Sequence, residues 1–439
     1  MNRRLLKLLR LHDATPVERS ASLWTAAFFF TVLCAYYLLR PLREEIGTAF
    51  GKENLLWLFV QTFVLISLLN PIYMLLANRL PTSRFLPGVL HAFAASFAVL
   101  AIVSMLVPPL QRGAVAWSSI EGLTAAFFYS WVTAFVVCGV ALVWVHAVDY
   151  FTTQQGKRLF GFVALGGTLG AIVASSVALL SSSLPRAWVM LVAGLVLEIA
   201  VLCHRRSLRA CIVMVGGDER TRTRVASAGV LQGLRLLVRS PYLLGIAAFV
   251  LISSVAATSF YYLLNDLAGS QIATEQERRA LFSTINLCQN LCALVIQVWV
   301  TRSALLRLGL AVVLCIMPAV TLLGLSLVAV VPTIVVMAVF EVARRTLQFA
   351  FDKPAREVLF TPLGLEEKYK SKAFLDTAVL RFGDLVGAGI NDLLVRLHVG
   401  AVAVAAGAVP FVILWCGVGW WLGRRCRDHE VDAAARAEL

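Results

Sequence analysis

The sequence predicts an all-α polytopic membrane protein, and three observations support this fold class. Of the 439 residues, 59% are hydrophobic and only 15% are charged. About twelve apolar stretches follow one another almost end to end, each roughly as long as a helix needs to cross the bilayer core. The charged residues are crowded into the short gaps between these stretches. A soluble protein cannot expose so much apolar surface, and no gap is long enough to fold as a separate enzyme domain.

The apolar stretches define twelve expected transmembrane helices, which account for most of the chain. Their limits follow from hydropathy and from the charged residues that flank each stretch. The expected spans are 22–39, 54–77, 85–107, 122–146, 159–180, 187–204, 241–264, 280–300, 307–327, 330–350, 372–396 and 400–422.

Membrane topology accounts for most of the net charge of +14. Lys and Arg concentrate in alternate gaps, as in Lys157-Arg158 and in the segment 205–240, which is the positive-inside pattern. The pattern predicts that both termini are cytoplasmic, and we expect no nucleic-acid partner. The opposite side keeps mainly Arg112, Arg186, Arg278, Arg279 and Arg396, together with a cluster after the first span.

Two pairs of similar words indicate that the chain is a duplication. The word "YYLLRPL" at 36–42 ends the first span and reappears as "YYLLNDL" at 261–267, where the seventh span ends. A weaker pair links 156–172, which opens the fifth span, with 370–390, which opens the eleventh. Both pairs relate a span to the one six places later, as in the parallel six-helix repeats of major-facilitator transporters. The expected domains are an N-terminal six-helix bundle 1–204, a cytoplasmic linker 205–240, a C-terminal six-helix bundle 241–423 and a cytoplasmic tail 424–439.

Charges at the outer end of the first span form the first candidate site. The segment "RPLREE" contains Arg40, Arg43, Glu44 and Glu45, and we expect Pro41 to break or kink the helix there. Ionisable residues within a span are costly and indicate function by default. Two interpretations remain open: an interfacial cluster that reaches water, or a clamp in which the arginines exchange their carboxylate partners for an anion.

The eleventh span carries the strongest functional signal, because it contains Asp376, Arg381 and Asp384. Three charges in one span cannot all face lipid. The carboxylates either neutralise Arg381 in a static pair or compete with a bound anion for it, and the sequence leaves both interpretations open.

A third group of charges begins in the tenth span and continues into the following loop. Glu341 and Arg344 lie within the span, and Arg356 and Glu357 follow in "FDKPAREVLF". Side chains of opposite charge three to five residues apart are typical of ion pairs on a helix surface. Function and structural ion pairing are equally good interpretations of Glu341.

Five further positions complete the candidate residues. Asp149 ends the fourth span just before Lys157 and Arg158, and pairing between them would close a cytoplasmic gate. Tyr37 and Tyr261 each lie in a copy of the repeated word, where their rings could face a flat base of the solute.

The sequence lacks the motifs of several classes of enzyme and metal site. The chain contains no Walker-type G-x-x-x-x-G-K-[ST] loop, no H-E-x-x-H pattern and no recognisable Ser/His/Asp arrangement. Its nine cysteines include no C-x-x-C pair, and most lie within expected spans. We therefore expect no enzymatic activity, no metal site and no cofactor.

Three segments of the chain resemble the ADP/ATP translocase family of plastids and intracellular bacteria. The resemblance is closer to the nucleotide-transporter-like major-facilitator proteins of free-living bacteria. The segments are "LLRPLREEI" (38–46), "WVHAVDYFTTQQGKRLFGFVALGGTLGAI" (144–172) and "FDKPAREVLFTPLGLEEKYKSKAFLDTAVLRFGDLVGAGI" (351–390). The positions that match the family pattern are Arg40, Arg43, Glu44, Lys157, Arg158, Phe160, Asp352, Arg356, Glu357, Pro362, Leu363, Lys370, Lys372, Arg381 and Gly383.

The resemblance implies exchange of nucleotides such as ATP and ADP across a bacterial inner (plasma) membrane, with basic side chains that hold the phosphates. The chain departs from the family pattern at three of the charged positions. Arg43 and Arg356 stand where the family usually has Lys, and Asp384 stands where it has Lys, which reverses a charge.

Three hypotheses for function follow. The first is a secondary transporter of an anionic solute, with a nucleotide as the leading substrate class. The second is a proton-coupled transporter of another metabolite with the same fold, and the third is a non-transporting membrane scaffold or sensor. The expected partners are a small-molecule anionic substrate, with a nucleotide as the leading class, and the lipid bilayer, and we expect a monomer. The expected substrate-binding residues are Arg40, Arg43, Arg356, Arg381, Lys157, Arg158, Tyr37 and Tyr261. The expected charge-balancing or coupling residues are Glu44, Glu341, Glu357, Asp376, Asp384 and Asp149.

Overall fold

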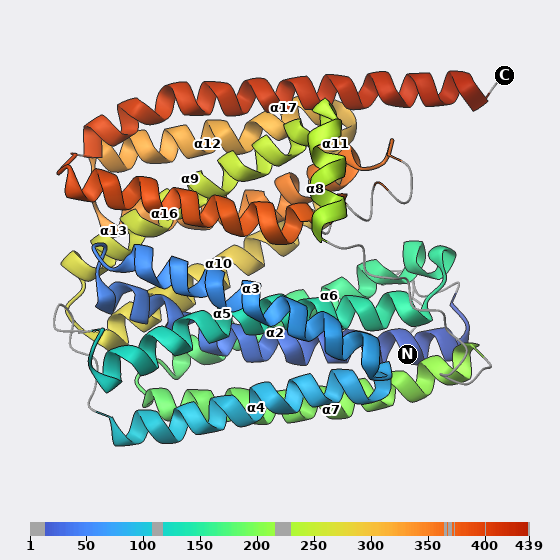
Figure 1. Ribbon diagram of the computed structural model, residues 1–439, viewed down its shortest axis with the longest axis horizontal. Coiled ribbons are helices and arrows are strands. Elements are labelled where there is room, and N and C mark those ends of the chain that lie inside the picture. The colour runs from blue at the N-terminus through green and yellow to red at the C-terminus, as the bar shows by residue number, and fades with distance from the viewer. Residues whose placement is uncertain are drawn as a thin grey trace. The chain divides into compact units, whose positions relative to one another are not determined.

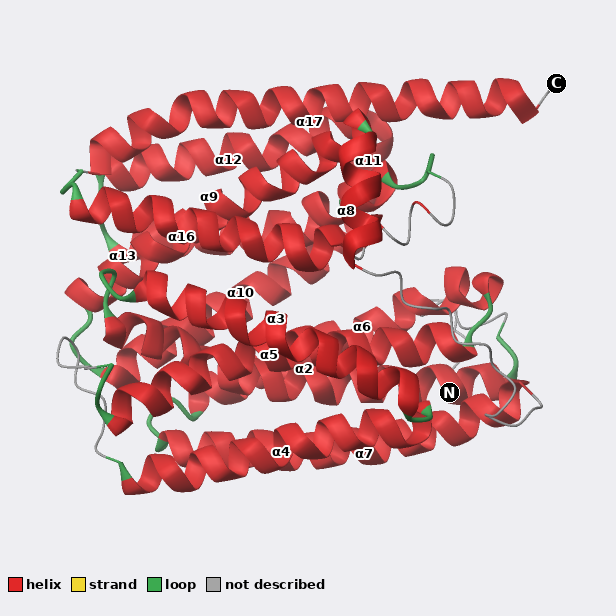
Figure 2. Ribbon diagram, in the orientation of Figure 1, coloured by secondary structure: helices red, strands yellow, loops and turns green. Residues whose placement is uncertain are grey.

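Helices make up almost all of the described chain (Figures 1 and 2). The computed structural model describes residues 14–107, 117–215, 230–363, 367, 371–372, 374–399 and 401–437. The elements are α2 (Pro16–Phe50), α3 (Leu55–Arg79), α4 (Thr82–Leu106), α5 (Ile120–Tyr150), α6 (Thr153–Leu180), α7 (Arg186–Val215), α8 (Val230–Arg239), α9 (Pro241–Gln271), α10 (Glu275–Trp299), α11 (Thr301–Leu308), α12 (Leu310–Val330), α13 (Ile334–Leu347), η2 (Gln348–Asp352), α14 (Lys353–Leu359), η3 (Leu375–Val379), α16 (Leu380–Arg396) and α17 (Ala401–Ala437).

Each of the twelve expected spans coincides with helical structure. Within the described residues, nine helices are long and apolar enough to cross a membrane. The other three expected spans correspond to α13, to η3 with α16, and to α17. Helix α13 is short because the chain passes into the π-helical turn η2 after 14 residues, and α16 carries the charges of the eleventh span. The chain is an all-helical, multi-pass membrane protein, as the sequence predicted.

The helix ends follow local sequence signals. Thr152 and Gln155 form a reciprocal capping box that starts α6. Ser119 caps α5, and Ser240 caps α9 with Pro241 at the first helical position. Helix α2 continues through Pro41 to Phe50, so the expectation that this proline breaks the helix is wrong.

The chain divides into two compact units. Unit 1 comprises residues 1–49, 64–225 and 274–287, and unit 2 comprises residues 50–63, 226–273 and 288–439. Helices α3 and α10 therefore each contribute residues to both units. The predicted domains are continuous segments of the chain, whereas these units are not, and the predicted domain limits remain a prediction. Residues 216–229 of the predicted linker lie outside the described residues.

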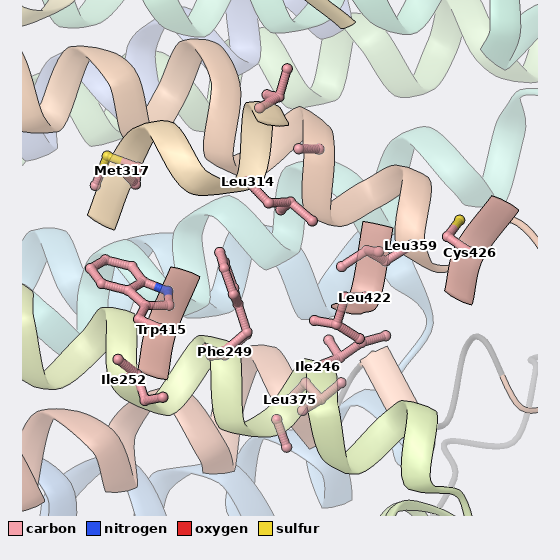
Figure 3. Packing of buried hydrophobic residues seen from close by; sticks show 14 of the residues in the cluster. Ile246, Phe249, Ile252, Leu314, Met317, Leu359, Leu375, Trp415, Leu422 and Cys426 are labelled. Atoms are coloured by element: carbon pink, nitrogen blue, oxygen red, sulfur yellow. The ribbon is translucent and has the colours of Figure 1, made fainter. Parts of the chain in front are cut away.

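Buried apolar side chains form the core of unit 2 (Figure 3). Trp415 of α17 is fully buried, and its ring centroid lies 5.8 Å from that of Phe249 of α9. Leu314 and Met317 of α12 belong to the same cluster. In this unit α12 packs along α17, and α9 packs along α16.

In unit 1, glycines let α6 approach the backbone of α2. A Cβ added at Gly166 would overlap the carbonyl oxygen of Ala26, and one added at Gly170 would overlap that of Phe30. The two glycines are four residues apart, which is the spacing of small-residue contacts between membrane helices.

We expect Gly170→Ala to destabilise the protein, because the added methyl group must push α6 away from α2. Overpacking of this kind costs about 1–3 kcal/mol. Thermal unfolding of the purified protein in detergent measures the effect. Gly161→Ala is the matched control, since a Cβ at Gly161 of the same helix meets no atom within 4 Å. Equal unfolding midpoints for the two variants would contradict the close contact between the two helices.

Candidate solute-binding site

Arg40 and Arg43 of α2 share one carboxylate within unit 1. The Nε atom of Arg40 lies 3.4 Å from Oε1 of Glu44, and Nη1 of Arg43 lies 3.4 Å from the same oxygen. Both arginine side chains are largely buried, with 13% and 14% of their surface exposed, and that of Glu44 is 3% exposed. Arg40 and Glu44 are four residues apart and therefore lie on the same face of the helix. The predicted cluster is a buried ion-pair group rather than a set of side chains that extend into water.

Aromatic rings surround these two guanidinium groups. The Cζ atom of Arg40 lies 5.4 Å from the ring centroid of Tyr37 and 5.9 Å from that of Tyr36. The Cζ atom of Arg43 lies 4.1 Å from the ring centroid of Tyr129 in α5. A cation over an aromatic face is attracted by the ring quadrupole, and the attraction is stronger where water is excluded. Arg43 Nε also donates a 2.8 Å hydrogen bond to Oγ1 of Thr133.

Arg381 forms an ion pair with Asp384 in unit 2. Arg381 Nη1 lies 3.0 Å from Asp384 Oδ2, and the two side chains are about one quarter and one fifth exposed. Ser254 of α9 donates a hydrogen bond to the other oxygen of Asp384. This pair is compatible with both interpretations, a static pair and a carboxylate that competes with an anion for Arg381, so the choice between them remains open.

The charges that follow α13 lie near two π-helical segments, η2 and η3. Arg356 Nε lies 3.1 Å from Oδ2 of Asp352, which is 1% exposed and ends η2. Lys372 Nζ lies 2.5 Å from Oε2 of the exposed Glu357. Asp376 of η3 interacts electrostatically with Arg356 and Lys372. Short π-helical segments are rare and occur frequently at functional sites.

Glu341 forms a fully buried ion-pair group on α13. Its carboxylate accepts two hydrogen bonds of 2.9 Å from Arg344, one to each oxygen, and a third from Arg345. The exposed fractions of the three side chains are 0%, 6% and 8%. This geometry favours structural ion pairing, because all three groups are desolvated and paired with one another on the same helix.

Two of the residues expected to form the cytoplasmic gate, Asp149 and Arg158, have other partners in unit 1. Arg158 Nη2 lies 3.0 Å from Oε1 of Glu18 at the start of α2. Asp149 accepts a 3.2 Å hydrogen bond from Oγ1 of Thr82. The side chain of Lys157 lies outside the described residues, and the predicted gate with Asp149 remains a prediction.

The two tyrosines of the repeated word are both buried. Tyr37 is 5% exposed and lies against Arg40. Tyr261 is 7% exposed, and its ring packs edge-on against Phe59 at a centroid distance of 5.7 Å within unit 2. That either ring stacks on a flat base of the solute remains a prediction.

A second buried ion-pair group in unit 1 was not anticipated. Glu45, which is 0% exposed, accepts hydrogen bonds from Arg186 at 2.8 Å and from Arg278 at 3.2 Å. Glu275 pairs at 2.7 Å with both Arg186 and Arg279. The sequence analysis placed these three arginines on the side that the positive-inside pattern leaves poor in Lys and Arg. Their position there was the signal in the sequence that they have acidic partners.

A buried histidine pair in unit 1 also escaped the sequence analysis. His146 and His204 are both 0% exposed, and their ring centroids lie 4.9 Å apart. Ser207 lies 2.7 Å from Nε2 of His146 and 2.7 Å from Oγ1 of Thr25. Within the described residues, no group of three or more His, Cys, Asp or Glu side chains is arranged to hold a metal ion.

Comparison with solved structures identifies the fold. A variant of the nucleoside transporter NupG matches with a TM-score of 0.59 and 14% identity over 93% of this chain and 99% of that chain. The chain shares the fold of this solved structure. A bacterial homologue of the iron transporter ferroportin in an inward-facing state matches with a TM-score of 0.61 and 13% identity over 93% and 98% of the two chains. A bacterial homologue of the human lysosomal transporter Spinster matches with a TM-score of 0.54 and 12% identity over 95% and 99%.

These likenesses extend over nearly the whole of each chain, so the shared fold includes nearly all of this chain. No protein-family model and no curated protein matches this chain. The resemblance to ADP/ATP translocases therefore gains no support from the comparisons.

Proposed function

We propose that this protein is a secondary transporter that moves an anionic solute across the membrane by alternating access. The major-facilitator fold supports this function, since such folds bind solutes near the bilayer midplane between their two repeats. The single observation that carries the choice of an anion is the buried group of Arg40, Arg43 and Glu44 in α2. Charged groups within a span are costly and are retained chiefly where they act on a substrate or ion.

In this proposal the solute replaces Glu44 as the partner of the two guanidinium groups. Arg40 and Arg43 bind the anionic group, and Glu44 neutralises them when the solute is absent. A planar guanidinium offers parallel N–H donors that fit a phosphate or carboxylate better than a lysine ammonium does. In unit 2, Arg356 and Arg381 act in the same way, with Asp352 and Asp384 as their resting partners.

A nucleotide is the first solute class to test. The rings of Tyr36, Tyr37 and Tyr129 lie beside the guanidinium groups, and a nucleotide carries both phosphates and a flat base that can stack on such rings. The sequence resemblance to nucleotide transporters points to the same class. The solved structures leave the solute open, because they include a nucleoside transporter and a homologue of an iron transporter.

A proton-coupled transporter of another metabolite is the second candidate. Asp384 lies in α16 between Arg381 and the hydroxyl group of Ser254, and it is partly accessible. A carboxylate held in this way within a span can bind a proton and release its arginine. Transport driven by a pH gradient without a counter-solute, and lost in Asp384→Asn, would favour this candidate.

A ligand screen by thermal unfolding tests the proposal. We expect ATP, ADP or another multivalent anion to raise the unfolding midpoint of the purified protein, because a ligand that binds the native state stabilises it by mass action. The stabilisation must be absent in Arg40→Gln, while the unliganded variant remains folded. Stabilisation without solute flux in proteoliposomes would indicate a sensor or scaffold instead.

A further inference from the structure

A pocket at one end of unit 1 combines an apolar wall with charged groups. Its volume is about 290 Å³, which is near the lower end of the size of small-molecule sites. Helices α2, α4, α5, α7 and α10 all contribute to its lining. Leu100, Phe128 and Met190 are among the apolar lining residues, and Glu121, Arg186 and Arg279 are among the charged ones.

The charged and apolar parts of the pocket are separated along the helices. Arg186 is the first residue of α7, and Glu121 is the second residue of α5. Phe128 of α5 lies seven residues beyond Glu121, which corresponds to about 10 Å along a helix. The charges therefore lie where the helices end, at the depth of lipid headgroups, and the apolar wall extends toward the hydrocarbon core. This order of polar and apolar groups matches that of a phospholipid.

The pocket adjoins a surface that faces lipid. Met105 lines the pocket and is 54% exposed, although α4 is long and apolar enough to span the membrane. Ile102 on the same helix and Leu123 on α5 are more than half exposed. Such large exposed apolar side chains on a spanning helix contact the bilayer, so a lipid has direct access to the pocket.

The polar groups in the pocket can bind two opposite charges. Arg279 is 8% exposed; it donates to the carbonyl oxygen of Leu184 and pairs with Glu275. Arg186 lines the same pocket, so two guanidinium groups are available to attract a phosphate there. Glu121 accepts hydrogen bonds from its own backbone and from Ser119, and within the described part of the chain it has no cationic partner.

We propose that this pocket binds a zwitterionic aminophospholipid. The phosphate pairs with the guanidinium groups of Arg186 and Arg279, the primary ammonium group pairs with Glu121, and an acyl chain lies along Phe128 and Met190. A glycerol headgroup lacks the cation that Glu121 requires, and a choline headgroup cannot donate a hydrogen bond to it. None of these residues belongs to the proposed solute site, so the inference is independent of the proposed function.

Lipid retention measured by native mass spectrometry tests the proposal. The protein is equilibrated in mixed micelles with equal amounts of phosphatidylethanolamine, phosphatidylcholine and phosphatidylglycerol that carry the same acyl chains. We expect the wild-type protein to retain phosphatidylethanolamine preferentially. In Glu121→Gln the preference for phosphatidylethanolamine over phosphatidylglycerol should fall about tenfold, since one charge-assisted hydrogen bond is lost. In Met190→Trp, retention of all three lipids should fall because the larger ring fills the pocket.

Glu198→Gln is the matched control, because it removes a half-exposed carboxylate from α7 outside the pocket. It should retain lipid as the wild-type protein does, and thermal unfolding confirms that each variant is folded. Equal or stronger retention of phosphatidylglycerol by the wild-type protein would overturn the proposal. So would an unchanged preference in a folded Glu121→Gln variant, or a folded wild-type protein that retains none of the three lipids.

Discussion

Replacing Glu341 by glutamine is expected to destabilise the protein by about 3–5 kcal/mol. The substitution removes the carboxylate that accepts hydrogen bonds from Arg344 and Arg345 and leaves both guanidinium groups buried with uncompensated charge. Most of this loss of stability comes from the two buried guanidinium groups that no longer have a carboxylate partner. Burying a charge without a partner destabilises a protein more than losing an ion pair at the surface does. Chemical unfolding of the purified protein in mixed micelles measures the change.

Glu357→Gln is the control for this prediction, since it also removes one carboxylate from an ion pair in unit 2. Glu357 is 57% exposed and its partner Lys372 is 33% exposed. Exposed pairs contribute about 0–1 kcal/mol, so this variant should unfold close to the wild-type protein. If Glu341→Gln were as stable as Glu357→Gln, the buried ion-pair group of α13 would not be structural.

Replacing Arg43 by glutamine is expected to reduce solute uptake about tenfold to a hundredfold, without unfolding the protein. The variant loses the charge-assisted hydrogen bond that we assign to the solute anion, which corresponds to about 1.5–3 kcal/mol. Arg43→Lys should retain part of the activity, because lysine keeps the charge but not the planar pair of donors. Initial rates of labelled solute uptake into proteoliposomes, at matched protein content, provide the measurement.

Arg206→Gln serves as the control for loss of positive charge. Arg206 is exposed on α7 and lies over the ring of Trp24 at 5.6 Å, outside the proposed solute site. Uptake by this variant should equal that of the wild-type protein. Wild-type rates in Arg43→Gln would show that Arg43 pairs with Glu44 for structural reasons alone.

The sequence predicted the helical framework well, because the signal for a membrane helix is local. Each expected span needed only a run of apolar residues of sufficient length, and each coincides with helical structure. Pairs within one helix were also accessible, since Glu341 and Arg344 are three residues apart and Arg40 and Glu44 are four apart. The π-helical turns η2 and η3 have no such local signature. They replace regular α-helix in part of two expected spans.

Contacts between helices were not predictable from local pattern. Arg43 and Thr133 are separated by 90 positions, and Glu45 and Arg278 by 233. No periodicity links such positions, so the sequence identified Arg43 as an intramembrane charge but not Tyr129 as the ring beneath it. For the same reason it assigned Arg186 and Arg278 to topology alone, although they balance the buried Glu45.

Counterflow in proteoliposomes tests the central claim most directly. Vesicles are loaded with an unlabelled multivalent anion, ATP first, and then diluted into the same anion carrying a label at trace concentration. An anion carrier that works by alternating access should accumulate the label transiently in loaded vesicles and not in vesicles without protein. If a folded, inserted protein produced no counterflow with any nucleotide or organic anion, while a neutral or cationic solute did accumulate, the assignment of Arg40 and Arg43 to an anionic substrate would be wrong.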